Sequence, residues 1–214
     1  MAEAKNREQR LIVVGGHSRN TGKTSLVVDI IRAFPANEWT AVKITQYGHG
    51  VCASSGDECD CAPTDHSFAL DEEHSLDART DSSRFLAAGA ARAFWLRSQQ
   101  DQLAEALPSL RAALAGASNV IIESNTLLRF LVPDLYLVVL DPSQPDFKAS
   151  ARQFLDRADA FVLRHPMESP EIAWPDVPAS LLSGKPSFPQ PLGEPLPPGL
   201  LEFVRLRLWP SVPV

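Results

Sequence analysis

The sequence predicts an α/β fold in which a mostly parallel sheet carries helices on both faces, followed by a proline-rich C-terminal extension. Three observations predict this class. Short apolar runs alternate with helix-like stretches up to residue 165, and such runs are typical of buried parallel strands. One of the runs leads through a glycine-containing loop directly into a helix. Twelve of the 18 prolines then fall between residues 166 and 214.

Each predicted strand is a short run rich in β-branched and other apolar residues. In chain order these strands are 10–16, 39–46, 92–98, 119–125, 134–141 and 159–165. The predicted helices place apolar residues at helical spacing. They are 21–34, 81–90, 99–117 with an interruption at Pro108, and 147–158. Ligands of such sheets bind at the carboxyl ends of the strands, so the chemistry is expected in the loops after residues 14, 46, 124 and 141.

The C-terminal part of the chain differs in composition from the rest. Proline lacks an N–H and breaks both helices and central strands, so we expect residues 166–214 to be extended over the surface and outside the sheet. Within this part, residues 199–209 fit one last amphipathic helix. We therefore divide the chain into a domain at 10–165, with a Cys/His-rich acidic insertion at 47–79, and an extension at 166–214.

The bulk composition excludes some classes of function. The chain has 214 residues, 44% of them hydrophobic and 21% charged, with a formal net charge of −6. Nucleic-acid and anionic-membrane binders usually show a basic patch or run, and the sequence has none. No apolar run approaches the ~18 residues of a membrane span, and the N-terminus lacks a signal-peptide pattern. We expect a cytoplasmic protein in which structural disulfides are disfavoured.

A phosphate-binding loop follows the first strand. The stretch HSRNTGKTS at 17–25 lies between a strand and a helix and ends in Gly-Lys-Thr, as the P-loop pattern G-x-x-x-x-G-K-[ST] requires. His17 stands where that pattern has its first glycine. We expect Gly15-Gly16 to supply the tight turn instead, with His17 at the start of the loop and away from the phosphates.

Each part of this loop has a physical role. Backbone N–H groups at a helix N-terminus can point at phosphate oxygens, and Gly22 lets the backbone approach closely. Lys23, which we expect to be exposed, supplies a charge near the β- and γ-phosphates, and the Thr24 hydroxyl can ligate Mg²⁺. The alternative is a chance strand–turn–helix. The predicted nucleotide-binding residues are Gly16, Asn20, Thr21, Gly22, Lys23, Thr24 and Ser25.

Two further stretches make the sequence resemble a known family. They are D-S-x-R-x-x-x-A-G-A at 81–90 and VIIESN at 120–125, a strand that ends with an acid. With the loop and VKITQYGHG at 42–50, they resemble the MobB family over roughly residues 10–165. MobB-like proteins are P-loop NTPases of the SIMIBI-type branch, which also holds dethiobiotin synthetase and nickel metallochaperone GTPases. The resemblance implies GTP binding with Mg²⁺, slow hydrolysis, dimerisation, and partnership with a guanylyltransferase of molybdenum-cofactor biosynthesis.

The resemblance carries catalytic roles to Lys23, Asp81 and Glu123. An acid at the end of that strand can orient water or hold Mg²⁺ through water. The alternative to a catalytic role is a structural one. For Glu123 this is a helix cap or a salt bridge, and for Asp81 it is the N-cap of the helix that follows. The guanine-reading motif N-K-x-D is missing, so GTP rests on the resemblance and ATP stays open. Asp141 ends a strand on the ligand edge, but a turn role is the default for its Asp-Pro-Ser sequence.

The loop after the second strand gathers metal-ligating residues. All three cysteines and His49, His66 and His74 lie between 47 and 79, among eight acids and no basic residue from 48 to 78. A long loop poor in aliphatic residues has no core of its own, and a metal would organise it. The alternative is an acidic switch loop with incidental thiols. The predicted Zn²⁺ ligands, in a spacing that suits a tetrahedral site, are Cys52, Cys59, Cys61 and His66.

Four functions follow from these patterns. The first is a MobB-like NTP-binding adaptor with slow hydrolysis, and the second is a metal-delivery GTPase that uses the Cys/His loop. The third is a small-molecule ligase or kinase similar to dethiobiotin synthetase, and the fourth is a non-catalytic binding module. A ligase would need further basic residues for an acidic substrate. The candidates for that role, which are scattered in the sequence, are Arg19, Lys43, Arg84 and Arg129.

Overall fold

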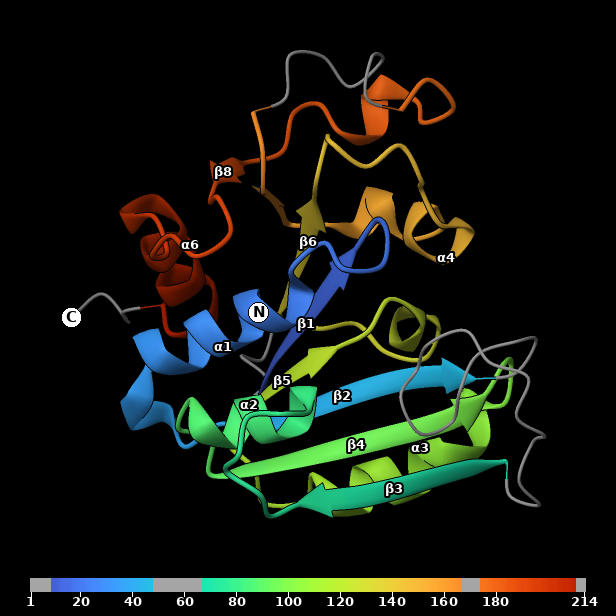
Figure 1. Ribbon diagram of the computed structural model, residues 1–214, viewed down its shortest axis with the longest axis vertical. Coiled ribbons are helices and arrows are strands. Elements are labelled where there is room, and N and C mark those ends of the chain that lie inside the picture. Colours follow the sequence, from blue (N-terminus) through green and yellow to red (C-terminus); the bar gives the residue numbers. More distant parts are fainter. Residues whose placement is uncertain (1–8, 48–66, 167–173, 211–214) are drawn as a thin grey trace, which may run out of the picture.

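One eight-stranded sheet organises the molecule in the computed structural model, which describes residues 9–47, 67–166 and 174–210 (Figure 1). The strand order is β3-β4-β2-β5-β1-β6-β7-β8, and every neighbouring pair is parallel except the antiparallel pair β3 and β4. The strands are β1 Arg10–Gly16, β2 Thr40–Tyr47, β3 Phe68–Glu73, β4 Arg92–Gln99, β5 Asn119–Glu123, β6 Leu135–Leu140, β7 Ala160–Leu163 and β8 Ser187–Pro189.

Helices cover both faces of this sheet, as the sequence predicts. Helices α1, α2 and α6 pack on one face and α3 on the other, where short 3₁₀ turns join it. The helices are α1 Lys23–Ala33, α2 Asp81–Ala87, α3 Leu103–Ala113, α4 Ala149–Arg152 and α6 Pro198–Leu208. In the described ranges, no helix combines the length and the apolar character that crossing a membrane requires.

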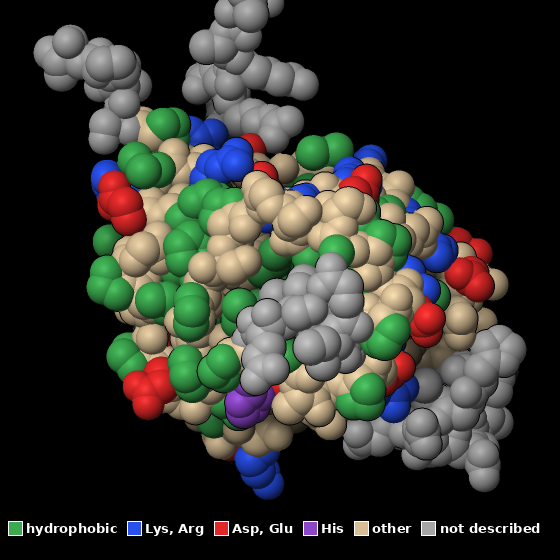
Figure 2. All heavy atoms as spheres, turned by 90° about the horizontal axis from the view of Figure 1, so that it is seen from above, with side chains coloured by type: hydrophobic (Ala, Val, Ile, Leu, Met, Phe, Trp, Pro, Cys, Tyr) green, Lys and Arg blue, Asp and Glu red, His purple; other side chains and the backbone are tan. Residues whose placement is uncertain are grey.

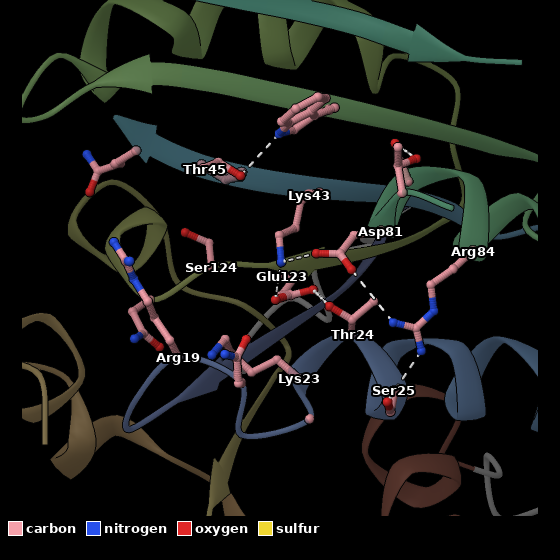
Figure 3. A pocket seen from close by; sticks show the side chains of 18 of the residues that line it. Arg19, Lys23, Thr24, Ser25, Lys43, Thr45, Asp81, Arg84, Glu123 and Ser124 are labelled. Atoms are coloured by element: carbon pink, nitrogen blue, oxygen red, sulfur yellow. Dashed lines mark hydrogen bonds and ion pairs between the residues drawn. The ribbon is translucent and has the colours of Figure 1, made fainter. Parts of the chain in front are cut away.

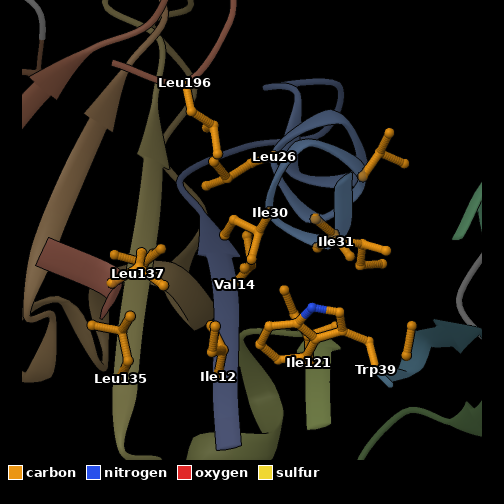
Figure 4. Packing of buried hydrophobic residues seen from close by; sticks show 14 of the residues in the cluster. Ile12, Val14, Leu26, Ile30, Ile31, Trp39, Ile121, Leu135, Leu137 and Leu196 are labelled. Atoms are coloured by element: carbon orange, nitrogen blue, oxygen red, sulfur yellow. The ribbon is translucent and has the colours of Figure 1, made fainter. Parts of the chain in front are cut away.

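The core on the α1 face fixes where the phosphate loop lies. Leu26 and Ile30 of α1 point toward the sheet, onto Val14 of β1 and Leu137 of β6 (Figure 4). All of these side chains are fully buried. Burying each one stabilises the fold by about 1.5–3 kcal/mol. The apolar stripe of α1 thereby holds the first turn of the helix at the carboxyl end of β1.

Two predicted helices differ from the structure. Helix α3 continues through Pro108, because the proline ring and Ala104, whose carbonyl loses its partner, both face solvent. The predicted helix at 147–158 is instead α4 and a separate 3₁₀ turn at Leu155–Arg157. Phe154 leaves the helical region with φ −121°, which allows Phe154 and Leu155 to be buried side by side.

Strand β3 lies inside the stretch that the sequence predicts to be a loop insertion. It has only three apolar residues, followed by Asp71, Glu72 and Glu73, so its pattern does not indicate a strand. Its acids pair across to β4, where Arg92 contacts Glu72 at 2.8 Å and Arg97 contacts Asp71. Each pair is diagonal, two residues away from the directly opposite position, and opposite charges at such positions stabilise an edge pair. The expectation of a loop throughout 47–79 is therefore wrong for this strand.

The expectation that the C-terminal part stays outside the sheet is also wrong. Strand β8 pairs in parallel with β7 and forms the edge of the sheet. Its Pro189 is tolerated because an edge strand does not need every N–H for pairing. Helix α6 confirms the final helix predicted at 199–209, and its Leu200 and Val204 are fully buried. The division of the chain at residue 165 stays a prediction.

Candidate functional site

The predicted phosphate loop, residues 17–22, joins the carboxyl end of β1 to the N-terminus of α1. Gly22 adopts φ +83°, a left-handed conformation that favours glycine, and a Cβ there would lie 2.8 Å from Arg164 Nε. A Cβ on Gly16 would lie 2.7 Å from Thr21 Oγ1. Gly22 is therefore required by its backbone conformation, and Gly16 by the close packing of the Thr21 side chain. Gly15 and Gly16 are the last two residues of strand β1 and pair with β6, so the expectation that they supply the tight turn is wrong.

His17 lies away from the loop interior and is fully buried. Its Nε2 accepts the Asp141 N–H at 3.0 Å, which leaves Nδ1 to donate to the Asp146 carbonyl at 2.8 Å. The ring stacks against Phe147 and Trp174, with centroids 5.2 and 4.8 Å away. In place of a phosphate contact, His17 joins the loop to the segment that follows β6.

This environment gives His17 a defined effect on stability. Burial lowers the pKa of the imidazole below its ordinary value of 6.5, and the neighbouring Asp146 carbonyl and Asp141 only partly oppose this. Because the unfolded chain binds the proton more readily, the contribution of His17 is lost as pH falls through 6.5.

We expect His17→Gln to be less stable than the parent at pH 8, with a gap that narrows below pH 6.5 by up to about 1.4 kcal/mol per pH unit. Urea unfolding of both proteins between pH 5 and 8 measures the gap. A gap that stays constant or widens toward low pH contradicts a neutral buried His17.

Two side chains from other strands hold the loop in place. Asn125, just after β5, exchanges hydrogen bonds with the backbone of Gly16, both at 2.9 Å. Arg164, just after β7, donates to the carbonyls of Gly22 at 2.6 Å and Thr21 at 3.3 Å. Because these side chains bind the loop carbonyls from outside, the N–H groups of the loop can face a ligand on the inside. Neither role could be predicted from the sequence, because side-chain contacts to the main chain leave no local pattern.

Arg164 also ties the loop to the C-terminal part of the chain. Its Nη1 donates to the side-chain oxygen of Gln190 at 2.8 Å, and Gln190 in turn donates to Asp29 of α1 at 2.9 Å. Arg164 is 3% exposed. Gln190, just after β8, therefore supports the phosphate loop through Arg164.

We expect Arg164→Met to lower the free energy of unfolding by about 2–4 kcal/mol, because it leaves buried carbonyls without donors. Arg152→Met, which removes an exposed charge from α4, serves as the control and should change stability by less than about 0.5 kcal/mol. Urea denaturation of the two variants measures the difference. Equal stability of the two variants would show that Arg164 does not anchor the loop.

Lys23 is half-buried at the centre of the loop, and is not exposed as the sequence analysis expects. Its Nζ donates to the Ser18 carbonyl at 2.6 Å. Burial lowers the pKa of this lysine to about 8, although Glu123 partly opposes the shift. A lysine held this way presents its ammonium toward the space that the loop encloses (Figure 3).

Thr24, Glu123, Lys43 and Asp81 form one connected network beside the loop (Figure 3). The Thr24 hydroxyl donates to Glu123 Oε2 at 2.8 Å. Lys43 Nζ lies between the two acids, 2.5 Å from Glu123 Oε1 and 2.7 Å from Asp81 Oδ2. Burial works against charge on Lys43, but these two carboxylates hold its pKa above the usual value. The structure thus brings all three predicted catalytic residues, Lys23, Asp81 and Glu123, to one place.

The geometry also bears on the alternative roles of the two acids. Thr80, and not Asp81, caps α2, through a capping box with Ser83. Burial of Asp81 opposes its ionisation, but the adjacent Lys43 ammonium holds the pKa of the carboxyl below its ordinary value. Glu123 is 3% exposed and makes the salt bridge that was its alternative role.

Arg84 and Ser25 complete the α1 and α2 side of the site. Arg84 Nη2 donates to Ser25 Oγ at 3.4 Å, and Nη1 lies 3.7 Å from Asp81. Asp141 takes the turn role that was its default, because its carboxylate accepts the Ser143 N–H at 3.0 Å. Thr21, by contrast, points inward and is 1% exposed.

A cleft of about 920 Å³ opens over this network. That volume is in the range of small-molecule and cofactor sites. Two acids, Asp81 and Glu123, line it, so the lining carries four net positive charges in a chain of net charge −6. The basic residues in the lining are Arg19, Lys23, Lys43, Arg79, Arg84 and Lys148.

This concentration of charge in the cleft differs from the charge distribution on the described face shown in Figure 2. On the face shown in Figure 2, basic side chains lie scattered among acidic and apolar ones in the described part of the chain. Three of the four bases considered for an acidic substrate, Arg19, Lys43 and Arg84, line the cleft. Arg129 does not, and pairs with Asp101 at 3.3 Å.

The predicted zinc ligands Cys52, Cys59, Cys61 and His66 lie outside the described residues, as does His49. Within the ranges 9–47, 67–166 and 174–210, no three His, Cys, Asp or Glu side chains gather as a metal site would require. His74 follows β3 and is exposed. The zinc site therefore stays a prediction from the sequence.

No family model matches the sequence, and neither does any curated protein. Among solved structures, LpxK from Aquifex aeolicus in complex with ATP is 18% identical over 85% of this chain and 53% of that chain, with a TM-score of 0.49. HypB from Helicobacter pylori in complex with nickel is 14% identical over 94% and 88%, with a TM-score of 0.44.

A Zn(II)-bound triple mutant of the YjiA GTPase is 13% identical over 90% of this chain and 61% of that chain, with a TM-score of 0.41. This chain spans about half the length of LpxK. At such identities the likeness concerns the arrangement of strands and helices, and the function is argued from the site alone.

Proposed function

We propose that this chain binds a nucleoside triphosphate together with Mg²⁺ at Gly16 and residues 20–25 and hydrolyses it slowly, as a MobB-like adaptor in molybdenum-cofactor biosynthesis. The observation that carries the proposal is the loop itself. Gly22 adopts a left-handed backbone conformation, and Arg164 binds the carbonyl of Gly22 from outside the loop. Lys23 presents its ammonium toward the enclosed space. Such a loop at a helix N-terminus is built for phosphate.

The residues present fit a magnesium ion. Mg²⁺ prefers oxygen ligands, usually one or two carboxylates or hydroxyls together with phosphate and water. The Thr24 hydroxyl and the carboxylates of Glu123 and Asp81 supply that donor set within one network. A bound Mg²⁺ would neutralise charge on the transferred phosphate. Lys43 supplies the balancing positive charge between the two acids.

Other residues of the site bind the phosphates and position the attacking water. Lys23 and the loop N–H groups bind and orient the phosphates, and Arg84 supplies further positive charge from α2. Glu123, which is almost fully buried, is placed to hold a water or a metal-bound water at the end of β5. Because Lys43 pairs with both acids of the site, Glu123 and Asp81, neither is a strong base, and slow hydrolysis is the expected rate class.

The MobB-like role is supported by the placement of the 81–90 stretch. This stretch forms α2 and brings Asp81 and Arg84 into the cleft beside Thr24 and Ser25. GTP, a guanylyltransferase partner and a homodimer belong to this part of the proposal. An adaptor should hydrolyse GTP slowly alone and change its rate when the guanylyltransferase is added.

A second candidate is a small-molecule ligase or kinase. One specific observation favours it: Arg19, Lys43 and Arg84, which are scattered in the sequence, converge on the cleft with Arg79 and Lys148. A reaction on an acidic small molecule needs such a lining. This candidate predicts that hydrolysis depends on a small acidic substrate and not on a protein partner.

Thermal unfolding with GTP, ATP and their diphosphates, each with and without Mg²⁺, tests the proposal. A ligand at one hundred times its dissociation constant stabilises the folded state by about 2.7 kcal/mol, which raises the melting temperature. We expect the largest rise with a triphosphate and Mg²⁺, and a smaller rise when the metal is removed by chelation. No shift with any nucleotide at millimolar concentration would reject nucleotide binding.

A further inference from the structure

Lys23, one of the six basic residues of the cleft, donates to the Ser18 carbonyl, and the other five fall into two groups. In the first, each cation has an acidic partner: Lys43 pairs with Glu123 and Asp81, Arg84 with Asp81, and Arg79 with Asp77. The second group consists of Arg19 and Lys148. Within the described ranges, neither of these two side chains makes a hydrogen bond or an ion pair.

Hydrogen bonds join the two segments that carry Arg19 and Lys148. The Lys148 N–H donates to the His17 carbonyl at 2.8 Å, so this residue is attached to the start of the phosphate loop. The adjacent Ser18 hydroxyl donates to Asp146 at 2.8 Å. Arg19 follows directly in the loop. The two segments are far apart in the sequence. His17 binds Lys148 and Ser18 binds Asp146, so the segments lie next to each other.

The positive charges of Arg19 and Lys148 repel each other, and the protein does not fully compensate this repulsion. Burial lowers the pKa of Lys148, and the charge of Arg19 lowers it further, while Asp146 opposes the shift only in part. The Asp146 carboxylate is already engaged by Ser18. Two like charges that face one cavity without a counter-ion are stabilised when an anion binds between them.

The nucleotide alone does not account for this charge. A triphosphate of charge about −4 keeps about −2 once Mg²⁺ is bound. The cleft lining has a net charge of +4 before any ligand is added, from six basic and two acidic side chains. Lys23, at the centre of the loop, and Arg84, beside Ser25, already serve the nucleotide phosphates. In Figure 3, Arg19 of the loop and Arg84 of α2 lie on opposite sides of Lys23.

We propose that Arg19 and Lys148 form a subsite for the phosphate or carboxylate group of a second, anionic ligand that binds beside the nucleotide. The proposal rests on the proposed nucleotide site and adds a substrate class to it. Phosphate and carboxylate share the geometry that a guanidinium and an ammonium recognise. The ligand would occupy the loop end of the cleft, next to the terminal phosphate.

The test uses the full chain loaded with Mg²⁺ and a non-hydrolysable triphosphate analogue. Inorganic phosphate and malonate are titrated separately by calorimetry at constant ionic strength. We expect the loaded protein to bind at least one of them at one site. Stronger binding of phosphate assigns a phosphate ester, and stronger binding of malonate assigns a carboxylate; each result supports the subsite.

The decisive variant is Arg19→Gln combined with Lys148→Gln. We expect its anion affinity to fall at least tenfold, with nucleotide affinity within threefold of the parent. Arg129→Gln combined with Arg152→Gln removes the same charge from outside the cleft and should retain both affinities. Thermal melting of both double variants should match the parent, because none of the four substitutions removes a buried partner.

Three results overturn the subsite. The first is that neither anion binds to the loaded protein. The second is that the Arg19/Lys148 variant loses nucleotide affinity as strongly as anion affinity, which would assign the pair to the nucleotide phosphates. The third is an equal loss in the control variant. In each case nucleotide binding by the parent protein leaves the proposed function standing, whereas a parent that binds no nucleotide rejects both.

Discussion

Lys23→Ala should weaken binding of a Mg²⁺-bound triphosphate at least ~100-fold, or about 2.7 kcal/mol. The physical reason is the position of the ammonium. The Ser18 carbonyl holds it inside a loop whose N–H groups provide only partial charges, so it adds a full positive charge to them. A charge-assisted hydrogen bond to phosphate in a half-buried site contributes more than a neutral one. Calorimetric titration of both proteins measures the loss.

Stability has to be measured alongside this loss, because Lys23 is half-buried and makes an internal hydrogen bond. Lys23→Met keeps the apolar stem and should unfold within about 1 kcal/mol of the parent. Arg111→Met, which removes an exposed charge from α3 outside the cleft, is the matched control for charge. Nucleotide affinity that is equal in the parent and in Lys23→Met would reject the role of the loop lysine.

Lys43→Met should destabilise the protein without nucleotide by about 2–4 kcal/mol, because it leaves two neighbouring carboxylates without a cation. The value lies below the range for a fully buried pair, since the Asp81 side chain is 37% exposed while that of Glu123 is 3% exposed. Millimolar Mg²⁺ should restore part of the loss in the variant and have less effect on the parent. Urea unfolding with and without Mg²⁺ measures both effects.

A double-mutant cycle separates the charge effect from lost packing. In the Lys43→Met background, Glu123→Gln removes one of the unbalanced charges and should recover at least about 1 kcal/mol. In the parent background the same Glu123→Gln change should destabilise, because it breaks the 2.5 Å ion pair with Lys43. If Glu123→Gln destabilises both backgrounds equally, Lys43 does not act as the counter-ion of Glu123.

The central strands could be predicted from the sequence because burial on both faces leaves a continuous apolar run. Strands β1, β5 and β6 show this pattern, and each was located within two residues of its ends. The edge strands β3 and β8 could not be located in this way. Strand β3 pairs with its neighbour through cross-strand charges, and β8 contains a proline that an edge strand tolerates. Neither strand therefore shows an alternating or continuous apolar pattern.

The candidate site was predictable to the extent that its chemistry is local. Lys23 and Thr24 follow from the loop pattern, and Asp81 and Glu123 meet because the loops at the carboxyl ends of parallel strands share one edge. The supporting residues were not predictable. Arg164 contacts the loop across more than 140 positions through main-chain carbonyls, and such a contact has no sequence signature.

The charge of the cleft shows a different limit of sequence analysis. Arg19 and Lys148 are single residues far apart in the sequence, and hydrogen bonds from the Lys148 N–H to the His17 carbonyl and from the Ser18 hydroxyl to Asp146 join their segments. The His17 side chain joins the same two segments, because its Nδ1 donates to the Asp146 carbonyl and its Nε2 accepts the Asp141 N–H. The residue that departs from the P-loop pattern thus helps to assemble the basic end of the cleft.

A crystal structure of the full chain with Mg²⁺ and a non-hydrolysable GTP or ATP analogue tests the central claim most directly. The proposed function predicts that the β-phosphate lies within hydrogen-bond distance of Lys23 Nζ and of the N–H groups of the loop. It also predicts that the metal contacts the Thr24 hydroxyl. Analogue density outside the loop, or an empty loop under conditions where the analogue saturates the protein in solution, would contradict the account.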